Sequence, residues 1–581
     1  MPESGDPVSG AGGKSTMLRS LGGVLGLLMT LVVAAAAPQD KAPKQPATVA
    51  GLPADKALAL GERMYREGIL PSGEPMQSVV SGDIPVAGTA FTCVSCHVRS
   101  GVGSYEGGVV TLATNGAKLA QSRYWKFPNL SPEERKDLRL QFPVARPPYT
   151  DDTLAQALRT GVDPSGRQLN PIMPCYDLND QDMAILVHYL WSLSAKLSPG
   201  VEAGTIHLAT VITDEVSPED QAAMLVPLNN YVARHNTHSS GFANRMYLSM
   251  GGQEMSGAYR KLALSVWRLR GAPETWGHQL EAYLAKEPVF ALLGGITTRE
   301  WKPIHVFCES HQLPCLFPIT DLPVISDSDW YTQYFSKGYY QEGQAAARYL
   351  HSLDDPAPAA RILQIIQDGP ESRDLAVGFR ETWQELGQGA IKEIHLKKGE
   401  AISLASLRKL LQQEQPTTVL LWSGPGSFEA LAGLAAEPGC PGLVFMSSRL
   451  LGTKLFALPE QARGFTCITY PYRAPKDELA VSRFANSLLT GLAKHRPETR
   501  ISTRTYSMLK LFEVGLADMD RNVYRDNFLD RISMQQDFAL PDYFRLSFGP
   551  GQRYASKGCF IMQLSAGPQP QLVRKSEWVI H

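Results

Sequence analysis

The chain contains little cysteine and histidine, and its charges nearly cancel. It has 8 cysteines and 12 histidines among 581 residues, and its net charge is −1. Such a chain has no excess of positive charge, which argues against nucleic-acid binding. Beyond residue 37 no run is long and apolar enough to cross a bilayer. The run SGPGS at 423–427 lacks the lysine of a phosphate loop, and the histidines outside one motif are scattered.

That motif is FTCVSCH, which places Cys93, Cys96 and His97 within five positions. Composition alone would give about 0.002 such matches in the chain. A C-x-x-C-H motif is typical of covalent haem attachment, in which the thiols form thioethers and the histidine binds the iron. The alternative is a redox-active or zinc-binding cysteine pair beside an incidental histidine.

Met173 is the predicted second axial ligand of such a haem. It lies between two prolines in NPIMPCY, just before a predicted helix at 179–197. A thioether sulfur completes the iron of many c-type haems and raises the reduction potential. Met183 and His188 compete for this role, but both lie inside the predicted helix, where Met183 has the spacing of a core residue.

The N-terminal segment (1–37) is predicted to be a secretory signal peptide. Residues 17–37 have a basic start, an apolar run and a terminal AAA that fits a cleavage site. An uncleaved membrane anchor is the alternative. No cysteine precedes Cys93, so we expect no lipoprotein anchor. Because haem c is attached outside the cytoplasm, signal and motif together predict a periplasmic protein with no membrane span after cleavage.

At this length the chain is expected to form more than one domain. A linker rich in proline, alanine and lysine (38–53) precedes the first domain (54–197). A short break rich in proline and glycine (198–204) precedes the second domain (205–581).

The first domain opens and closes with predicted amphipathic helices at 54–68 and 179–197. We expect them to cross, with Gly61 allowing a close approach to Tyr189. In GERMYREGI, CVSCHVRSGVGSYEGG and GVDPSGRQLNPIMPCYDLNDQDMAILVHYLWSLS, residues 56–196 resemble class I cytochromes c.

This resemblance implies an all-α domain with one covalent haem c, ligated by His97 and Met173, that exchanges electrons with redox partner proteins. A six-coordinate haem has no vacant site for a substrate, so electron transfer is favoured over enzymatic catalysis. The chain departs from the family in a long polar insert (111–146), which is either a docking surface or a lid over the haem edge. Three residues in or just after this insert are candidates for bonding the haem propionates, or are merely solvated loop residues: Trp125, Arg146 and Tyr149.

The second domain alternates short apolar runs with helical stretches. Strands are predicted at 206–212, 245–250, 289–293, 304–307 and 315–318, and then at 361–367, 393–397, 418–422, 442–446 and 464–470. Helices are predicted at 217–235 and 256–270. This alternation indicates parallel sheets covered on both faces, and the two sets indicate two Rossmann-like lobes with a ligand site between them.

In FALLGGITTREWKPIHVFCESHQLPCLFP, GYYQEGQAAARYL and SRDLAVGFRETWQELG, this domain resembles type I periplasmic solute-binding proteins, in particular branched-chain amino-acid binders. The resemblance implies a two-lobed α/β fold that closes on a small polar solute such as an amino acid or a carboxylate. It implies that Thr297 and Thr298 face the ligand carboxylate. The other candidates, at strand ends, are Thr320, Asp321, Trp422 and Ser447. Asp321 either pairs with a ligand ammonium or is a helix cap or surface acid.

Six cysteines remain outside the haem motif, and an oxidising compartment favours pairing among them. Cys308 ends one predicted strand and Cys315 begins the next, so a Cys308–Cys315 disulfide is expected. A second candidate pair is Cys440–Cys467. Buried free thiols are the alternative.

These patterns favour a periplasmic monohaem c-type cytochrome that transfers electrons, with a solute-binding-like module that senses a small ligand or docks a redox partner. The alternative is a solute receptor for a transporter or sensor, with the haem as a redox accessory. A haem oxidoreductase acting on a ligand held in the cleft is the third hypothesis, and a fold alone does not decide among the three.

Overall fold

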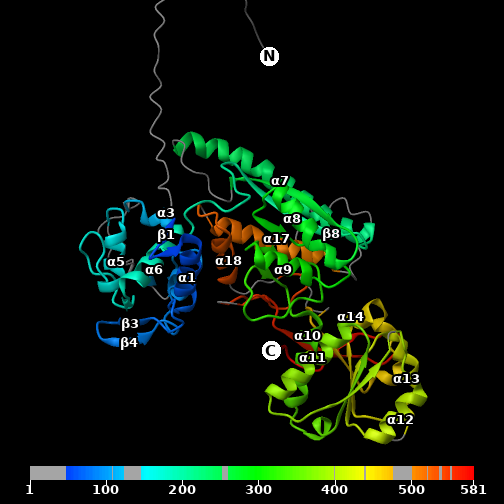
Figure 1. The fold of residues 1–581 in the computed structure, drawn as a ribbon. Helices are drawn as coiled ribbons and strands as arrows, with labels where there is room; N and C mark the ends of the chain where they lie inside the picture. Colours follow the sequence, from blue (N-terminus) through cyan, green and yellow to red (C-terminus); the bar gives the residue numbers. More distant parts are fainter. Residues whose placement is uncertain are drawn as a thin grey trace, which may run out of the picture. The chain divides into compact units, whose positions relative to one another are not determined.

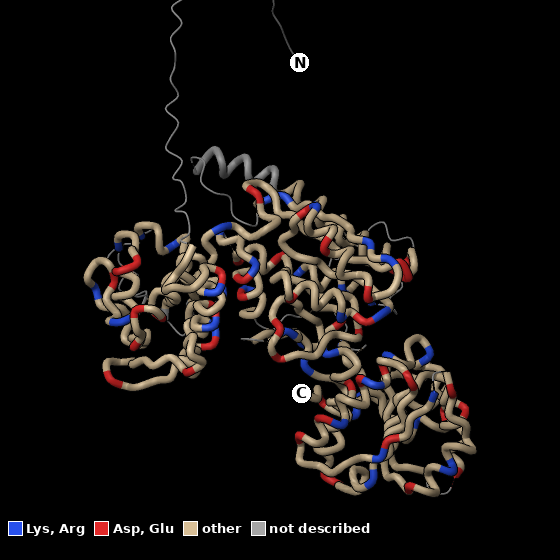
Figure 2. Tube along the Cα trace, in the orientation of Figure 1, with Lys and Arg blue, Asp and Glu red and all other residues tan. Residues whose placement is uncertain are grey.

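The computed structural model separates residues 1–47 from one compact unit that spans Thr48–His581. The described residues are 47–106, 109–123, 145–250, 259–397, 399–437, 440–474, 500–519, 521–535, 540–549 and 552–580. The predicted signal peptide, most of the linker, and Trp125 with most of its insert lie outside them. Figure 1 traces the described elements, and Figure 2 shows basic and acidic residues interspersed along them.

The N-terminal domain is built around two crossing helices, α1 (Ala54–Glu67) and α6 (Asp180–Ser192). A Cβ atom added to Gly61 would lie 2.5 Å from the Tyr189 Cβ and 2.8 Å from the Ile185 carbonyl oxygen. The predicted close approach at Gly61 is therefore confirmed. The shorter helices of this domain are α2 (Cys93–His97), α3 (Gly116–Leu119) and α5 (Asp151–Thr160).

This domain also contains strands, so the prediction of an all-α domain is wrong. A three-stranded antiparallel sheet has the order β4-β3-β7. Its strands are β3 (Gln77–Val80), β4 (Ile84–Ala87) and β7 (Cys175–Asp177). In β3, Ser78 and Val80 are buried and their neighbours are exposed, as in a strand with one face on a core. Two further pairs are β1 (Thr48–Val49) with β2 (Leu52–Pro53), and β5 (Tyr105–Glu106) with β6 (Val109–Val110).

The second domain has the two predicted α/β lobes. The sheet of lobe 1 is parallel throughout, with the order β12-β11-β10-β8-β9. Its strands are β8 (Thr205–Thr213), β9 (Lys261–Leu269), β10 (Ala291–Leu293), β11 (Cys315–Leu316) and β12 (Thr332–Gln333). Its helices are α7 (Pro218–Met250), α8 (Trp276–Lys286), α9 (Lys302–Ser310), α17 (Ile501–Asp518) and α18 (Arg525–Ser533). Residues of α7, α17 and α18 share one core with the strands, and residues of α8 and α9 share another.

Lobe 2 has the strand order β14-β13-β15-β16-β17-β18-β19, with β20 paired to β18. Strands β13 to β17 run parallel, and β18 to β20 add antiparallel pairs. The strands are β13 (Ile362–Gln367), β14 (Lys392–Leu396), β15 (Thr418–Trp422), β16 (Leu443–Ser447), β17 (Thr466–Tyr470), β18 (Gly558–Leu564), β19 (Leu572–Arg574) and β20 (Val579–Ile580). The helices are α10 (Gly338–His351), α11 (Pro370–Glu385), α12 (Leu404–Glu414), α13 (Phe428–Leu434), α14 (Ser448–Leu451) and α15 (Glu460–Arg463).

Three element predictions in lobe 1 are wrong. The predicted strand at 245–250 lies in α7, and the predicted helix at 256–270 contains β9. The predicted strand at 304–307 lies in α9, which begins with Lys302 and a proline, a favoured residue for the first helical turn. Ile304, Phe307 and Cys308 are buried on one face of α9, whereas Val306 is 55% exposed, so this apolar run has helical spacing.

Candidate functional site

A cavity of about 320 Å³ lies beside the C-x-x-C-H motif. Cys93, Cys96, His97 and Met173 all line it, so the four predicted haem residues surround one space. Its other walls are mostly apolar: Val110, Leu112, Leu119, Leu154, Leu158 and Leu190. Prosthetic groups bind in such apolar pockets with a few placed polar groups. The donor set and the lining therefore fit a haem c.

The imidazole of His97 is oriented by the backbone. Its Nδ1 lies 2.7 Å from the carbonyl oxygen of Leu112, so the ring donates Nδ1–H to this carbonyl and keeps Nε2 as its basic nitrogen. Burial lowers the pKa of His97, although the hydrogen bond to Leu112 opposes this effect. The ring is therefore neutral near pH 7, the form in which histidine binds a metal.

The loop that carries Met173 is held at both ends. β7 follows this loop and pairs with β3, with Tyr176 opposite Ser78. On the other side, the Ser81 N–H donates to the Pro171 carbonyl oxygen at 2.7 Å. The small sheet thus fixes the position of the methionine relative to the cavity.

Two of the three candidate propionate residues, Arg146 and Tyr149, line the cavity. The Arg146 guanidinium donates to the carbonyl oxygens of Lys118, Gln121 and Pro147 and lies 4.4 Å from the centre of the Tyr149 ring. These bonds fasten the loop beside the cavity. Arg123 also lines the cavity, although the sequence did not single it out.

The segment after the C-x-x-C-H motif, Arg99 and Ser100, is hydrogen-bonded to α18. The Asp530 carboxylate accepts hydrogen bonds from the Ser100 N–H (3.1 Å), the Ser100 hydroxyl (3.0 Å) and the Arg99 N–H (3.3 Å). The Arg99 guanidinium lies 4.3 Å from the centre of the Trp330 ring, in the loop before β12. Burial, followed by the nearby Asp526 charge, raises the pKa of Asp530 to about 6. No local sequence pattern indicates this contact.

In lobe 1, Thr297 and Thr298 are bonded to a carboxylate of the chain itself. The Thr297 hydroxyl donates to Glu215 Oε1 at 2.8 Å, and the Thr298 N–H donates to the same oxygen at 3.3 Å. The Thr213 hydroxyl, at the end of β8, donates to it at 2.6 Å. Sequence reasoning identified the two predicted threonines but missed Glu215.

Thr320 and Asp321 follow β11, next to Thr297 along the sheet edge, because Ile296 pairs with Ile319. Asp321 is half-buried and faces two arginine side chains. Its Oδ1 lies 3.1 Å from Arg504 Nη1 and 3.8 Å from Arg449 Nε. Burial opposes its ionisation, but the two guanidinium groups lower the pKa of Asp321.

Arg449, on α14 of lobe 2, joins this cluster to a fully buried acid of α10. Its Nε lies 3.6 Å from Glu342 Oε1 and donates to the Tyr472 hydroxyl at 3.1 Å. Burial raises the pKa of Glu342 to about 7, with Arg449 as the main opposing influence. Two atoms of this group, Arg449 Nη1 and Glu342 Oε1, are buried without a hydrogen-bond partner among the described residues. Glu342 Oε1 is thus held by the charge of Arg449 at 3.6 Å without a hydrogen bond.

Trp422 and Ser447 are both buried inside lobe 2. Trp422 is completely buried in the core of lobe 2 and donates its Nε1–H to Gln364 Oε1 at 2.7 Å. Ser447 is also completely buried, and its hydroxyl accepts the Leu450 N–H at the start of α14. Both residues end interior strands of the parallel sheet, β15 and β16, and such strands are buried on both faces.

The cysteines outside the haem motif are free thiols in this structure. Cys308 and Cys315 are fully buried in one core cluster, and burial together with a hydrogen bond to Cys315 raises the pKa of Cys308. Cys440 and Cys467 belong to different core clusters of lobe 2, so the structure does not bring the second candidate pair together.

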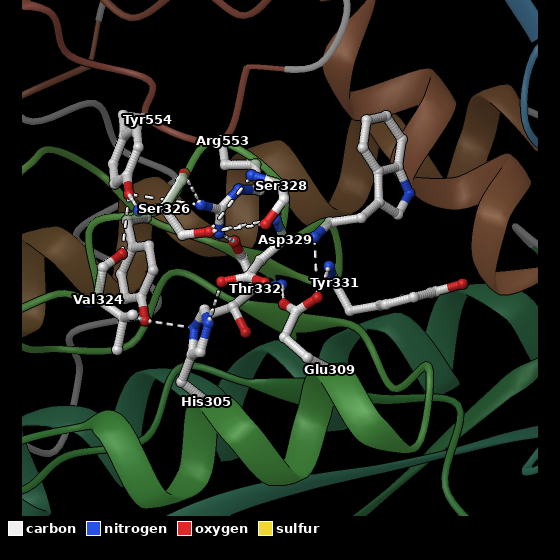
Figure 3. A network of polar contacts seen from close by, with 12 residues as sticks. His305, Glu309, Val324, Ser326, Ser328, Asp329, Tyr331, Thr332, Arg553 and Tyr554 are labelled. Carbon is white, nitrogen blue, oxygen red and sulfur yellow. Dashed lines mark hydrogen bonds and ion pairs between the residues drawn. The ribbon is translucent and has the colours of Figure 1, made fainter. Parts of the chain in front are cut away.

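A further polar network holds the loop between β11 and β12 (Figure 3). His305 bridges the Tyr334 hydroxyl (2.9 Å) and Asp329 Oδ2 (2.9 Å). Glu309 accepts the N–H groups of three successive residues, Trp330, Tyr331 and Thr332, at 2.8 to 3.1 Å. These bonds are satisfied within the protein, so we assign the network a structural role in holding Trp330 against the N-terminal domain.

Among the described residues, no group of three or more histidine, cysteine, aspartate or glutamate side chains is arranged to hold a metal ion. None of the helices in the described part of the chain is both long and apolar enough to span a membrane.

Comparison with known proteins gives one family match, and no curated protein matches the sequence. The solved structures that are similar to the chain at low identity include the following three. A fatty acid ABC transporter substrate-binding protein from Thermomonospora curvata is 15% identical, with a TM-score of 0.41 over 66% of this chain and 95% of its own. An ABC transporter solute binding protein of R. palustris in complex with benzoate is 13% identical, with a TM-score of 0.44 over 65% and 97%. A branched chain amino acid ABC transporter protein from Thermus thermophilus with bound valine is 12% identical, with a TM-score of 0.45 over 66% and 98%.

The family model covers more than half of the chain, over residues 261–568. These residues include β9 to β12 and almost all of lobe 2, together with the return of the chain through α17 and α18. The chain belongs to the periplasmic binding protein family.

Proposed function

We propose that this protein is an extracytoplasmic solute receptor whose N-terminal domain carries one covalent haem c as a redox accessory. Membership of the periplasmic binding protein family is the observation that supports the receptor role and the location. The electron-transfer hypothesis favoured by the sequence then becomes the second candidate, because the family match covers the lobes and not the haem motif.

The haem proposal depends on the cavity and its donor set. Cys93 and Cys96 would form the thioether links, and His97 and Met173 would ligate the iron. A haem c so held supplies one-electron transfer. The chain itself orients the His97 ring through Leu112, fixes the Met173 loop through β7, and places cationic and phenolic groups of Arg123, Arg146 and Tyr149 at the cavity wall.

The solute proposal depends on the charged cluster of Asp321, Glu342, Arg449 and Arg504, of which all side chains but that of Asp321 are buried. Arg449 and Glu342 belong to lobe 2, whereas Asp321 and Arg504 belong to lobe 1, so this cluster crosses between the lobes. Because a solute shifts an open–closed equilibrium only through different affinity for the two states, groups shared by both lobes are suited to this role.

Substituting Met173, the candidate iron ligand, tests the haem proposal. We expect the full chain, produced with haem-attachment machinery outside the cytoplasm, to keep haem after acid-acetone extraction and to show a low-spin spectrum. Met173→Leu should open the iron to added ligands and lower its potential. Met183→Leu, the same exchange in the α6 core, is the matched control and should do neither. A haem-free wild-type protein, or an unchanged Met173→Leu spectrum, contradicts the assignment.

A solute screen in both redox states, together with an electron-exchange assay, distinguishes the two candidate functions. A receptor with a haem accessory should bind its solute in both redox states and respond to a broad solute screen with a raised melting temperature. An electron-transfer protein that uses the lobes only for docking should give no solute response but should exchange electrons with a partner.

A further inference from the structure

Glu215 lies where the predicted solute carboxylate would bind. Its Oε1 accepts three hydrogen bonds, from the Thr213 hydroxyl, the Thr297 hydroxyl and the Thr298 N–H, at 2.6, 2.8 and 3.3 Å. The donors come from two adjacent positions of the sheet edge, because Ile212 pairs with Ile296. Two hydroxyls and a backbone N–H that converge on one oxygen are the donor set expected for a bound carboxylate.

Helix capping does not explain this position. α7 begins at Pro218, and the Asp220 N–H donates to the Ser217 hydroxyl at 3.1 Å, so Ser217 serves as the cap of that helix. Glu215 precedes the cap and turns toward the loop after β10 instead. The three hydrogen bonds to Glu215 therefore hold its carboxylate in place and do not cap α7.

The electrostatics of Glu215 agree with a tightly held anion. Burial raises the pKa of this carboxyl, but the hydrogen bonds from the Thr213 hydroxyl, from the backbone N–H of Glu215 itself, and from Thr297 and Thr298 together outweigh it and bring the pKa to about 2. The second oxygen, Oε2, is buried and has no hydrogen-bond partner among the described residues. One oxygen is thus saturated with donors, and the other is an unused acceptor.

We infer that Glu215 is a built-in occupant of the lobe 1 carboxylate seat, defined here as Thr213, Thr297 and Thr298, and that it excludes free carboxylates from it. This inference rests on the proposed receptor function and narrows its solute. The solute brings no carboxylate to this seat, which opposes the expectation that Thr297 and Thr298 bind the carboxylate of an amino acid. Glu215 is then a specificity-determining residue.

Chemical rescue tests this inference without knowledge of the solute. Glu215→Ala empties the seat, and acetate is the probe that refills it. We expect acetate, compared with chloride at equal ionic strength, to raise the melting temperature of the full-chain Glu215→Ala protein in a saturable way. The wild type and the exposed control Glu219→Ala should not respond. Glu215→Gln, whose amide fills the same space, should bind acetate at least about tenfold more weakly than Glu215→Ala.

A second exchange shows where acetate binds. Adding Thr297→Val to Glu215→Ala should abolish the response, because one of the donors is lost. If Glu215→Ala does not fold in chloride, recovery of folded protein during refolding in acetate is the readout. The inference is overturned if acetate has no effect on Glu215→Ala by either readout. It is also overturned if acetate or leucine binds the wild type and Thr297→Val removes that binding. Neither result depends on whether the receptor has a natural solute, so the proposed function is tested separately by the solute screen.

Discussion

Removing the Arg449 guanidinium should destabilise the lobes in a pH-dependent way. The Arg449 side chain is 3% exposed and Glu342 is completely buried, with 3.6 Å between Arg449 Nε and Glu342 Oε1. Arg449→Met leaves Glu342 without its cation, whereas Asp321 keeps Arg504 at 3.1 Å. Breaking one partner out of a buried ion pair costs about 3–5 kcal/mol, so we expect a loss near the lower bound at about pH 8.

The pH dependence follows from Glu342. Burial raises the pKa of Glu342 from 4.5 to about 7. This difference in pKa between the folded and unfolded chains makes the free energy of unfolding about 3 kcal/mol larger at low pH than at high pH. Because the folded pKa is the higher one, this contribution is complete below pH 4.5 and is lost as the pH rises through about 7. Without Arg449 the folded pKa rises further. Arg449→Met should therefore lose less stability near pH 5.5, where Glu342 is mostly protonated, than near pH 8.

Urea unfolding midpoints of the full chain at the two pH values measure this difference. Arg449→Met combined with Glu342→Gln should recover much of the loss at pH 8, because the unpaired charge is gone. Arg373→Met, which removes a guanidinium whose side chain is 64% exposed, should change the midpoint little at either pH. Equal losses at both pH values, or no recovery in the double variant, would refute the assignment of Glu342 as the charge that Arg449 stabilises.

Two further predictions concern packing and the thiols. Gly61→Val should destabilise the N-terminal domain by about 1–3 kcal/mol in urea unfolding, because the new Cβ meets Tyr189 and Ile185, whereas Gly204→Val, with nothing within 4 Å, should have a small effect. Non-reduced peptide mapping of protein exported to an oxidising compartment should find Cys308 linked to Cys315, and an alkylated Cys308 would contradict the predicted disulfide.

Periodicity predicted most strands of the lobes because buried parallel strands are short, continuous apolar runs. It failed at β9, KLALSVWRL, which is rich in good helix formers such as leucine, alanine, lysine and arginine. Pairing with β8 over nine residues, Lys261 to Leu269, overrides that local preference. Periodicity also failed at 304–307, since a run of four residues with three apolar ones does not distinguish a strand from one helical turn.

The candidate sites differ in how far the sequence could predict them. Cys93, Cys96 and His97 lie within five positions, so their spacing alone was enough to predict haem attachment. Glu215 and Thr297 are 82 positions apart, and only the pairing of their strands brings them together. The role of Asp321 likewise depends on Arg449 and Arg504, which lie far downstream and in different lobes.

The contact at α18 bears on whether the two predicted domains behave independently. Phe528 and Ile532 of α18 belong to the core of lobe 1, while Asp530 of the same helix bonds the segment just after the haem motif. The Arg66 guanidinium of α1 reaches Asp526 at 3.1 Å as well. Removing the N-terminal domain would take away all three donors of Asp530, which is 5% exposed in the full chain. The break at 198–204 therefore separates the two domains in sequence, but polar contacts connect them in the structure. For this reason the solute and redox measurements require the full chain.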